Sequence, residues 1–157
     1  MTYREKIALL DFSVVEDAVV SGYEASMAII AALMTGGILV GTTNYITNHY
    51  QTGIQNHKEW KGREINKNHI SQVNEVIQRL YPLTNPKDRV LSKESKAKIH
   101  PSQQKYFIAA LQASRDFDPT YLVTSDYSLH ELAEVFQPSI QIITPGNYVK
   151  QNNLSLR

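Results

Sequence analysis

The chain has 157 residues, of which 42% are apolar and 20% are charged, a composition typical of one globular domain and not of a disordered chain. It contains no cysteine, which excludes zinc ribbons, disulfide frameworks and thiol nucleophiles. A net charge of +1 favours no class of charged partner, so nucleic-acid binding has to be judged from local patterns.

The most apolar segment, residues 26–41, is shorter than the ~20 residues of a membrane-spanning helix and is interrupted by Thr35, Gly36 and Gly37. We therefore expect a buried helix followed by a buried strand there. The first residues carry both acidic and basic side chains and lack the pattern of a signal peptide. These features predict a cytoplasmic protein that does not contact a membrane.

The first strand is predicted at residues 7–10, a continuous apolar run that suits a strand buried on both faces, and it ends at Asp11. Apolar residues at helical spacing predict a helix over residues 24–35. Residues 38–41 are predicted as a second strand, and the polar residues 42–55 as the helix that follows it.

The middle of the chain alternates charged segments with predicted helices. Residues 57–68 form either a solvated connector or a basic rim in which Trp60 stacks on a base. A helix is predicted over residues 70–80 and a largely buried one over residues 101–115. Residues 85–99 between them are expected to be an exposed loop. That loop is either simply solvated or a contact surface for phosphates through Lys93, Lys96 and Lys98.

The carboxyl-terminal third predicts a β-α-β unit. A strand at residues 121–124 is followed by Asp126, and Ser128 with Glu131 forms a capping box that opens an amphipathic helix. A second strand is predicted at residues 139–144, and the Thr-Pro-Gly sequence at its end is predicted as a turn. The two strands should be parallel, and ligands of such sheets bind beyond the carboxyl ends of the strands, where Asp126 lies.

These segments resemble the PIN-domain family. The sequence LVTSDYSLHELAEVF, with IQIITPGNYV after it, resembles the family's carboxyl-terminal signature, and KIALLDFSVVEDAVV resembles its opening strand. Phe12 departs from the small or polar residue that usually follows the first aspartate. The resemblance implies one α/β domain over residues 1–157, a three-layer α/β/α sandwich with a mostly parallel central sheet.

The resemblance also implies a site. PIN-domain proteins are mostly metal-dependent nucleases in which acidic residues hold magnesium or manganese, and Asp11 and Asp126 match two of those acids as catalytic residues and metal ligands. Polar but neutral residues stand at the other acidic positions of the family pattern, and with Thr124 they are expected to line the pocket: Asn48, Gln103 and Ser128. A loss of carboxylates lowers affinity for a hard cation.

Two acids in the first helical turn after Asp11, Glu16 and Asp17, add either a carboxylate to that site or a favourable interaction with the helix dipole. Asp11 and Asp126 themselves could instead meet as helix-capping or turn-forming acids. The five histidines lack a zinc-ligand spacing, and no Gly-x-Ser-x-Gly or dinucleotide-binding glycine pattern occurs.

Three functions follow as hypotheses. The first is a PIN-like metal-dependent ribonuclease acting on RNA, a toxin of a toxin–antitoxin pair that is restrained by an antitoxin-like protein and forms a homodimer. The second is a catalytically degenerate PIN-like domain that binds RNA or a protein partner, with Trp60 and the lysine-rich loop as its contact surface. The third is an α/β domain that binds a small ligand or a nucleotide.

Overall fold

The computed structural model describes residues 5–57, 67–84, 91–132 and 139–154 of the chain. Its central sheet is parallel and has the order β1-β4-β5, formed by β1 (Ile7–Leu10), β4 (Thr120–Val123) and β5 (Gln141–Ile143). A second parallel pair, β2 (Gly41–Thr42) and β3 (Tyr81–Pro82), is joined to β1 by a bridge between Ala8 and Val40. The prediction of a mostly parallel sheet is therefore confirmed.

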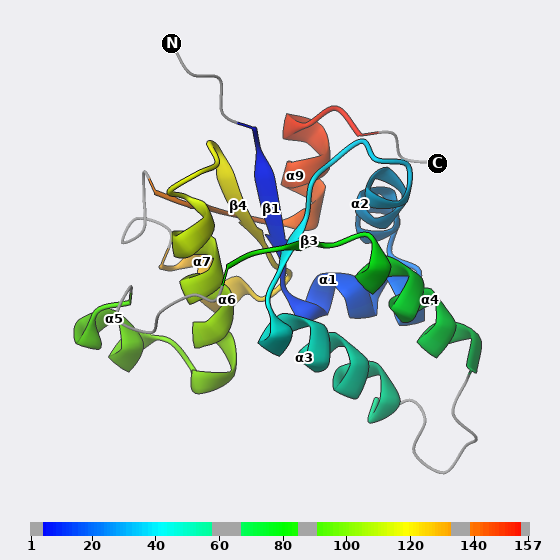
Figure 1. Cartoon of the computed structure of the whole chain (residues 1–157), viewed down its shortest axis with the longest axis horizontal. Coiled ribbons are helices and arrows are strands. Elements are labelled where there is room, and N and C mark those ends of the chain that lie inside the picture. The colour runs from blue at the N-terminus through cyan, green and yellow to red at the C-terminus, as the bar shows by residue number, and fades with distance from the viewer. Residues whose placement is uncertain (1–4, 58–66, 85–90, 133–138, 155–157) are drawn as a thin grey trace.

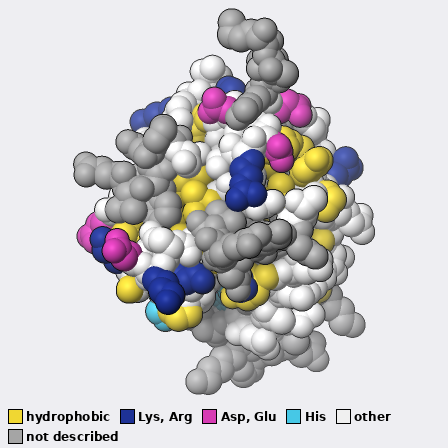
Figure 2. Space-filling view, turned by 60° about the vertical axis from the view of Figure 1, so that its left-hand side comes forward, with side chains coloured by type: hydrophobic (Ala, Val, Ile, Leu, Met, Phe, Trp, Pro, Cys, Tyr) yellow, Lys and Arg dark blue, Asp and Glu magenta, His cyan; other side chains and the backbone are white. Residues whose placement is uncertain are grey.

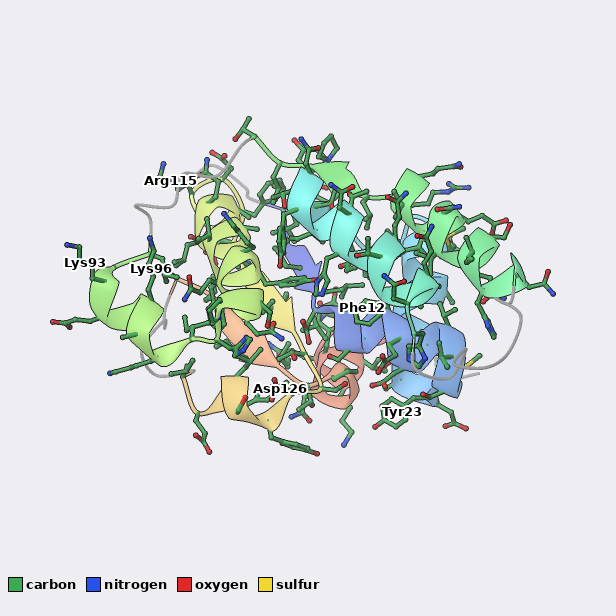
Figure 3. All side chains as sticks on the ribbon, turned by 90° about the horizontal axis from the view of Figure 1, so that it is seen from below. Phe12, Tyr23, Lys93, Lys96, Arg115 and Asp126 are labelled. Atoms are coloured by element: carbon green, nitrogen blue, oxygen red, sulfur yellow. The ribbon has the colours of Figure 1, made fainter. Side chains whose placement is uncertain are left out.

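Helices cover both faces of this sheet (Figures 1 and 3). Helix α6 packs against β1 and β4, whereas α2 and α9 pack against each other on the opposite side. This arrangement is a three-layer α/β/α sandwich. The described helices are α1 (Phe12–Glu16), the π-helix η1 (Asp17–Ser21), α2 (Glu24–Met34), α3 (Asn44–Gln55), α4 (Lys67–Gln78), α5 (Lys93–Lys98), α6 (Pro101–Ala113), α7 (Tyr127–His130) and α9 (Pro145–Gln151).

The core lies between these layers. All four residues of β1 and all four of β4 are buried, as expected for strands covered on both faces. Helix α6 contributes an almost continuous buried run from Tyr106 to Ala110, which matches its predicted burial. Within the described residues, no single helix is long and apolar enough to cross a membrane. The segment formed by α1 and η1 reaches the necessary length and apolar character only in combination with α2, and a bend of 102° separates the two.

The predicted loop over residues 85–99 is wrong in its second half, because Lys93–Lys98 form α5. Ser92 makes this helix possible: its side chain accepts a hydrogen bond from the backbone N–H of Ser95 at 3.2 Å. Two lysines, Lys96 and Lys98, lie in the last turn, where the helix dipole favours positive charge. A six-residue helix is too short to show a clear apolar period in the sequence.

Two helix starts also differ from their predictions. Asp126, and not Ser128, caps α7, since its carboxylate accepts from the backbone N–H of Ser128. The Thr-Pro-Gly sequence is not a turn: Thr144 accepts from the backbone N–H of Asn147 and caps α9, and Pro145 occupies the first turn. Proline suits that place because no helical hydrogen bond needs its nitrogen. The predicted helix beyond Leu132 lies outside the described residues.

Candidate functional site

Strands β1 and β4 end side by side. Their register pairs Leu10 with Val123, and the backbone N–H of Asp11 donates to the carbonyl of Val123 at 2.9 Å. The residue after β4, Thr124, donates its own N–H to Ile143 on β5 at 3.0 Å. Because parallel strands end at one edge, Asp11 and Thr124 meet there, and both are buried.

The carboxylate of Asp11 is only half satisfied. Its Oδ2 accepts from Ser13 Oγ at 2.7 Å and from Thr124 Oγ1 at 3.0 Å. Its Oδ1 is buried and has no hydrogen-bond partner among the described residues. A buried polar atom in that state is uncommon and costs free energy, which makes it a candidate position for binding a ligand.

Asp126 lies one hydroxyl group away from Asp11. The backbone N–H of Asp126 donates to Thr124 Oγ1 at 3.0 Å, and that same hydroxyl donates to Asp11. The Asp126 carboxylate accepts from the backbone N–H and the hydroxyl of Ser128 at 3.0 and 2.7 Å. Asp126 is thus both a helix cap and a neighbour of the Asp11 site, so the two interpretations of this residue are compatible.

Two residues of α3, His49 and Tyr50, lie close enough to Asp11 to interact with its charge. His49 Nδ1 lies 2.8 Å from the hydroxyl of Tyr106, and the ring centroid of His49 lies 5.4 Å from that of Phe12. Burial lowers the pKa of His49, and the negative charge of Asp11 opposes that shift. The predicted residue Asn48 is exposed, so its side chain points away from this buried group.

Gln103, at the start of α6, has a buried Oε1 that also lacks a hydrogen-bond partner among the described residues. Two buried tyrosines surround the site. The hydroxyl of Tyr50 donates to the carbonyl of Leu10. Burial, together with the charge of Asp11, raises the pKa of Tyr50 and of Tyr106, so both keep their protons at neutral pH.

A serine pair extends the site toward η1, and sequence patterns did not identify it. Ser13 Oγ, which donates to Asp11, accepts from the backbone N–H of Ser125 at 3.1 Å. Ser125 Oγ donates to Asp17 Oδ2 at 2.9 Å. Asp17 is therefore the nearby carboxylate of the two that the sequence offered, whereas Glu16 pairs with His57 at 2.8 Å. The available signal was a serine close to each strand-end acid: Ser13 two residues after Asp11, and Ser125 directly before Asp126.

The lysines predicted to bind phosphates lie elsewhere. Lys93 and Lys96 project from α5 at one side of the molecule, across α6 from Phe12 (Figure 3). On that side, Lys and Arg side chains lie at separate places and some have acidic neighbours (Figure 2). Lys98 is exposed on the same helix. Trp60 lies outside the described residues.

The chemistry of this edge is that of oxygen ligands. Asp11 Oδ1 is a buried acceptor without a donor among the described residues, and a carboxylate oxygen of this kind suits magnesium or manganese. In the part of the chain that the structure describes, no three His, Cys, Asp or Glu residues are grouped so as to hold a metal ion. The residues present therefore fit a weakly held, largely hydrated cation better than a fully enclosed one.

No protein-family model matches this chain, and no curated protein sequence matches it. Among solved structures, it is similar to a chain in the crystal structure of VapBC2 from Rickettsia felis bound to a DNA fragment from their promoter. The TM-score is 0.61 at 12% sequence identity, and the match covers 88% of this chain and 98% of the other. At that identity the likeness concerns the fold. The chain has a PIN-like α/β/α fold.

Proposed function

We propose that this protein is a PIN-like ribonuclease of the toxin–antitoxin kind, in which Asp11 and Asp126 bind magnesium or manganese. The observation that carries the proposal is the buried Asp11 carboxylate, which has an unpartnered oxygen at the carboxyl edge of a PIN-like sheet. A stability role alone would favour a fully hydrogen-bonded or apolar group at this place.

The residues around Asp11 position it for this task. Ser13 and Thr124 hold Oδ2 with two hydrogen bonds, which fixes the rotamer and leaves Oδ1 free to bind. The cap on α7 fixes Asp126 in the same way. When bound, a divalent ion at such a site supplies positive charge to the phosphate and acidity to a bound water.

The test is cleavage of a mixed pool of single-stranded RNA with magnesium, with manganese and with a chelator. We expect metal-dependent cleavage by the wild type and its loss in Asp11→Asn and Asp126→Asn. Asp116→Asn is the matched control, because it removes the same charge from an exposed position just before β4. Thermal unfolding of each variant separates lost activity from lost folding.

Cleavage that persists in Asp11→Asn, or that proceeds equally in the chelator, would contradict the proposed site. Calorimetry with manganese adds a second readout. We expect heat of binding in the wild type and in Asp116→Asn, and none in Asp11→Asn. If the wild type neither cleaves RNA nor binds manganese, the nuclease proposal fails.

A second candidate is a catalytically degenerate PIN-like domain that binds RNA or a protein. It is favoured by the absence of a third grouped acidic ligand in the described residues. It is also favoured by a groove of about 510 Å³ between η1, α2 and α4, whose lining includes Val19, Met27 and Ile30. Met27 is 45% exposed there, and an apolar groove of this kind suits an apolar segment of an antitoxin-like partner or of a second copy.

This candidate predicts binding without cleavage. Charge reversal of Lys93, Lys96 and Lys98 to Glu should then abolish RNA binding and leave the fold unchanged, whereas Asp11→Asn should leave binding intact. Sedimentation of the wild type and of Met27→Glu tests the groove: a dimer that dissociates in the variant supports self-association there. Binding that survives the triple charge reversal would exclude α5 as the RNA contact surface.

A further inference from the structure

A pocket of about 740 Å³ opens beside the Asp11 site. Its volume is within the ~300–1,000 Å³ of typical small-molecule sites. One wall is the turn between η1 and α2, with Asp17, Tyr23 and Glu24; the other is the start of α7, with Ser125 and Tyr127. The start of α9 forms the remaining side. In Figure 3, Tyr23 and Asp126 lie at the same end of the molecule.

The pocket is connected to the Asp11 site by hydrogen bonds. Ser125 donates its backbone N–H to Ser13, the serine that holds Asp11, and its hydroxyl to Asp17 in the pocket. The turn between η1 and α2, which forms one wall of the pocket, is fixed by its own backbone. Gly22 has a left-handed φ of 68°, and the backbone N–H of Tyr23 donates to the carbonyl of Asp17 at 2.9 Å. A ligand in the pocket is therefore adjacent to whatever binds at Asp11.

The side chains select the kind of ligand. Asp17 and Glu24 are carboxylates, which repel a phosphate and accept hydrogen bonds from a neutral donor. Ser125 occupies only one of the acceptor positions on Asp17 Oδ2, so both oxygens of Asp17 can still accept from a ligand. Tyr23 and Tyr127 are 52% and 80% exposed, and aromatic rings at the rim of a pocket provide stacking surfaces for planar groups.

We propose, resting on the ribonuclease function above, that this pocket binds one unstacked base of single-stranded RNA next to the phosphate that a metal ion on Asp11 would hold, and that it prefers guanine. Guanine presents two adjacent N–H donors, N1–H and N2–H, that a carboxylate can accept together. Adenine and cytosine present one amino group each, and uracil presents one N–H between two carbonyl oxygens that a carboxylate repels. Bases of single strands are recognised through these edges and by stacking.

The experiment measures binding and not cleavage, so that it can fail separately from the proposed function. Labelled octauridine RNAs that carry a single central G, A, C or U are titrated by fluorescence anisotropy in a chelator. The proteins are the wild type, Asp17→Asn and Tyr127→Ala, with Asp116→Asn and Tyr81→Ala as matched controls. Tyr81 is also exposed, at 44%, but it contacts Phe117 near the other end of β4.

We expect the G-containing RNA to bind the wild type roughly tenfold more tightly than the all-U RNA, the discrimination of one bidentate contact. Asp17→Asn should lose most of that preference. Tyr127→Ala should weaken binding of all four RNAs by roughly tenfold, since stacking does not depend on the base. The two controls should bind as the wild type does.

Equal binding of the four RNAs by the wild type, or an unchanged preference in Asp17→Asn, would overturn the proposal. Free guanosine that binds as tightly as the G-containing RNA would overturn the assignment to RNA. Cleavage without base preference would remove this inference and leave the nuclease. A preference for the G-containing RNA in a protein that never cleaves RNA would support the guanine pocket and contradict the nuclease proposal.

Discussion

Strand β1 buries four apolar residues in a row, whereas the next residue, Asp11, is charged and equally buried. Burial of a leucine such as Leu9 stabilises the fold by roughly 1.5–3 kcal/mol. Burial of a carboxylate costs free energy unless both oxygens are satisfied, and one oxygen of Asp11 is not. The core is therefore built for stability, and the adjoining edge retains a cost that stability does not explain.

The strongest test of this contrast compares Leu9→Ala with Asp11→Asn. Leu9 is fully buried, so Leu9→Ala should lower the free energy of unfolding by about 2–5 kcal/mol. Asp11→Asn removes a buried charge and keeps an oxygen that can accept from Ser13 and Thr124, so we expect an unchanged or higher stability. Urea unfolding measures both. A loss in Asp11→Asn as large as that in Leu9→Ala would make Asp11 a structural residue.

The ionisable groups of the core predict a loss of stability at high pH. Burial, and then the neighbouring Tyr121, raises the pKa of Tyr148 to about 12. The pKa of a tyrosine in the unfolded chain is ~10. The protonated Tyr148 therefore contributes its full share to the free energy of unfolding below that pH, and this share is lost as the pH rises to about 12. The loss amounts to about 2–3 kcal/mol.

Urea unfolding at about pH 8 and about pH 11.5 gives the alkaline loss of the wild type, to which Tyr50 and Tyr106 also contribute; we expect a smaller loss in Tyr148→Phe, and the difference isolates the contribution of Tyr148. The exposed Tyr127 supplies the control, because Tyr127→Phe should keep the wild-type dependence. Identical alkaline losses in the two variants would mean that Tyr148 ionises equally in the folded and unfolded states.

Two buried threonines, Thr120 at the start of β4 and Thr124 directly after its end, test whether the Asp11 site differs from the core. Thr124 Oγ1 donates to Asp11 and accepts from the backbone N–H of Asp126, whereas Thr120 Oγ1 donates to the carbonyl of Phe117. Thr124→Val should cost about 1–3 kcal/mol, because it removes two hydrogen bonds and leaves the half-buried N–H of Asp126 without its acceptor, and Thr120→Val, which removes one, about 1 kcal/mol. Thermal unfolding compares them. Equal costs would show that the Asp11 site has no special dependence on this hydroxyl.

Two glycines near the Asp11 site differ in the space around them. A Cβ atom on Gly53 of α3 would lie 2.6 Å from the ring of Phe12, whereas one on Gly146 at the pocket would meet no atom within 4 Å. Gly53→Ala should therefore cost about 1 kcal/mol after the gain in helix propensity, and Gly146→Ala should change the free energy of unfolding little. A stabilising Gly53→Ala would show that Phe12 moves freely.

Much of the fold followed from local patterns. The apolar run of β1 and the buried run of α6 were predicted near their observed positions, because strand and helix periods are set by neighbouring residues. Helix α5 was missed because its six residues, five charged or polar and one alanine, show no apolar period. The cap of α7 was misplaced by two residues, since Asp126 and Ser128 are both good capping residues and only coordinates distinguish them.

The sequence by itself determined the alternation of strands and helices and the position of Asp11 and Asp126 at strand ends. It also determined the neutral residues at the other expected acidic positions. The tertiary structure alone decided that His49, and not the exposed Asn48, lies near the charge of Asp11, and that Asp17, Ser125 and Ser13 join the site. Ser13 and Ser125 lie 112 residues apart in the chain, and the parallel register of β1 and β4 is what brings them together.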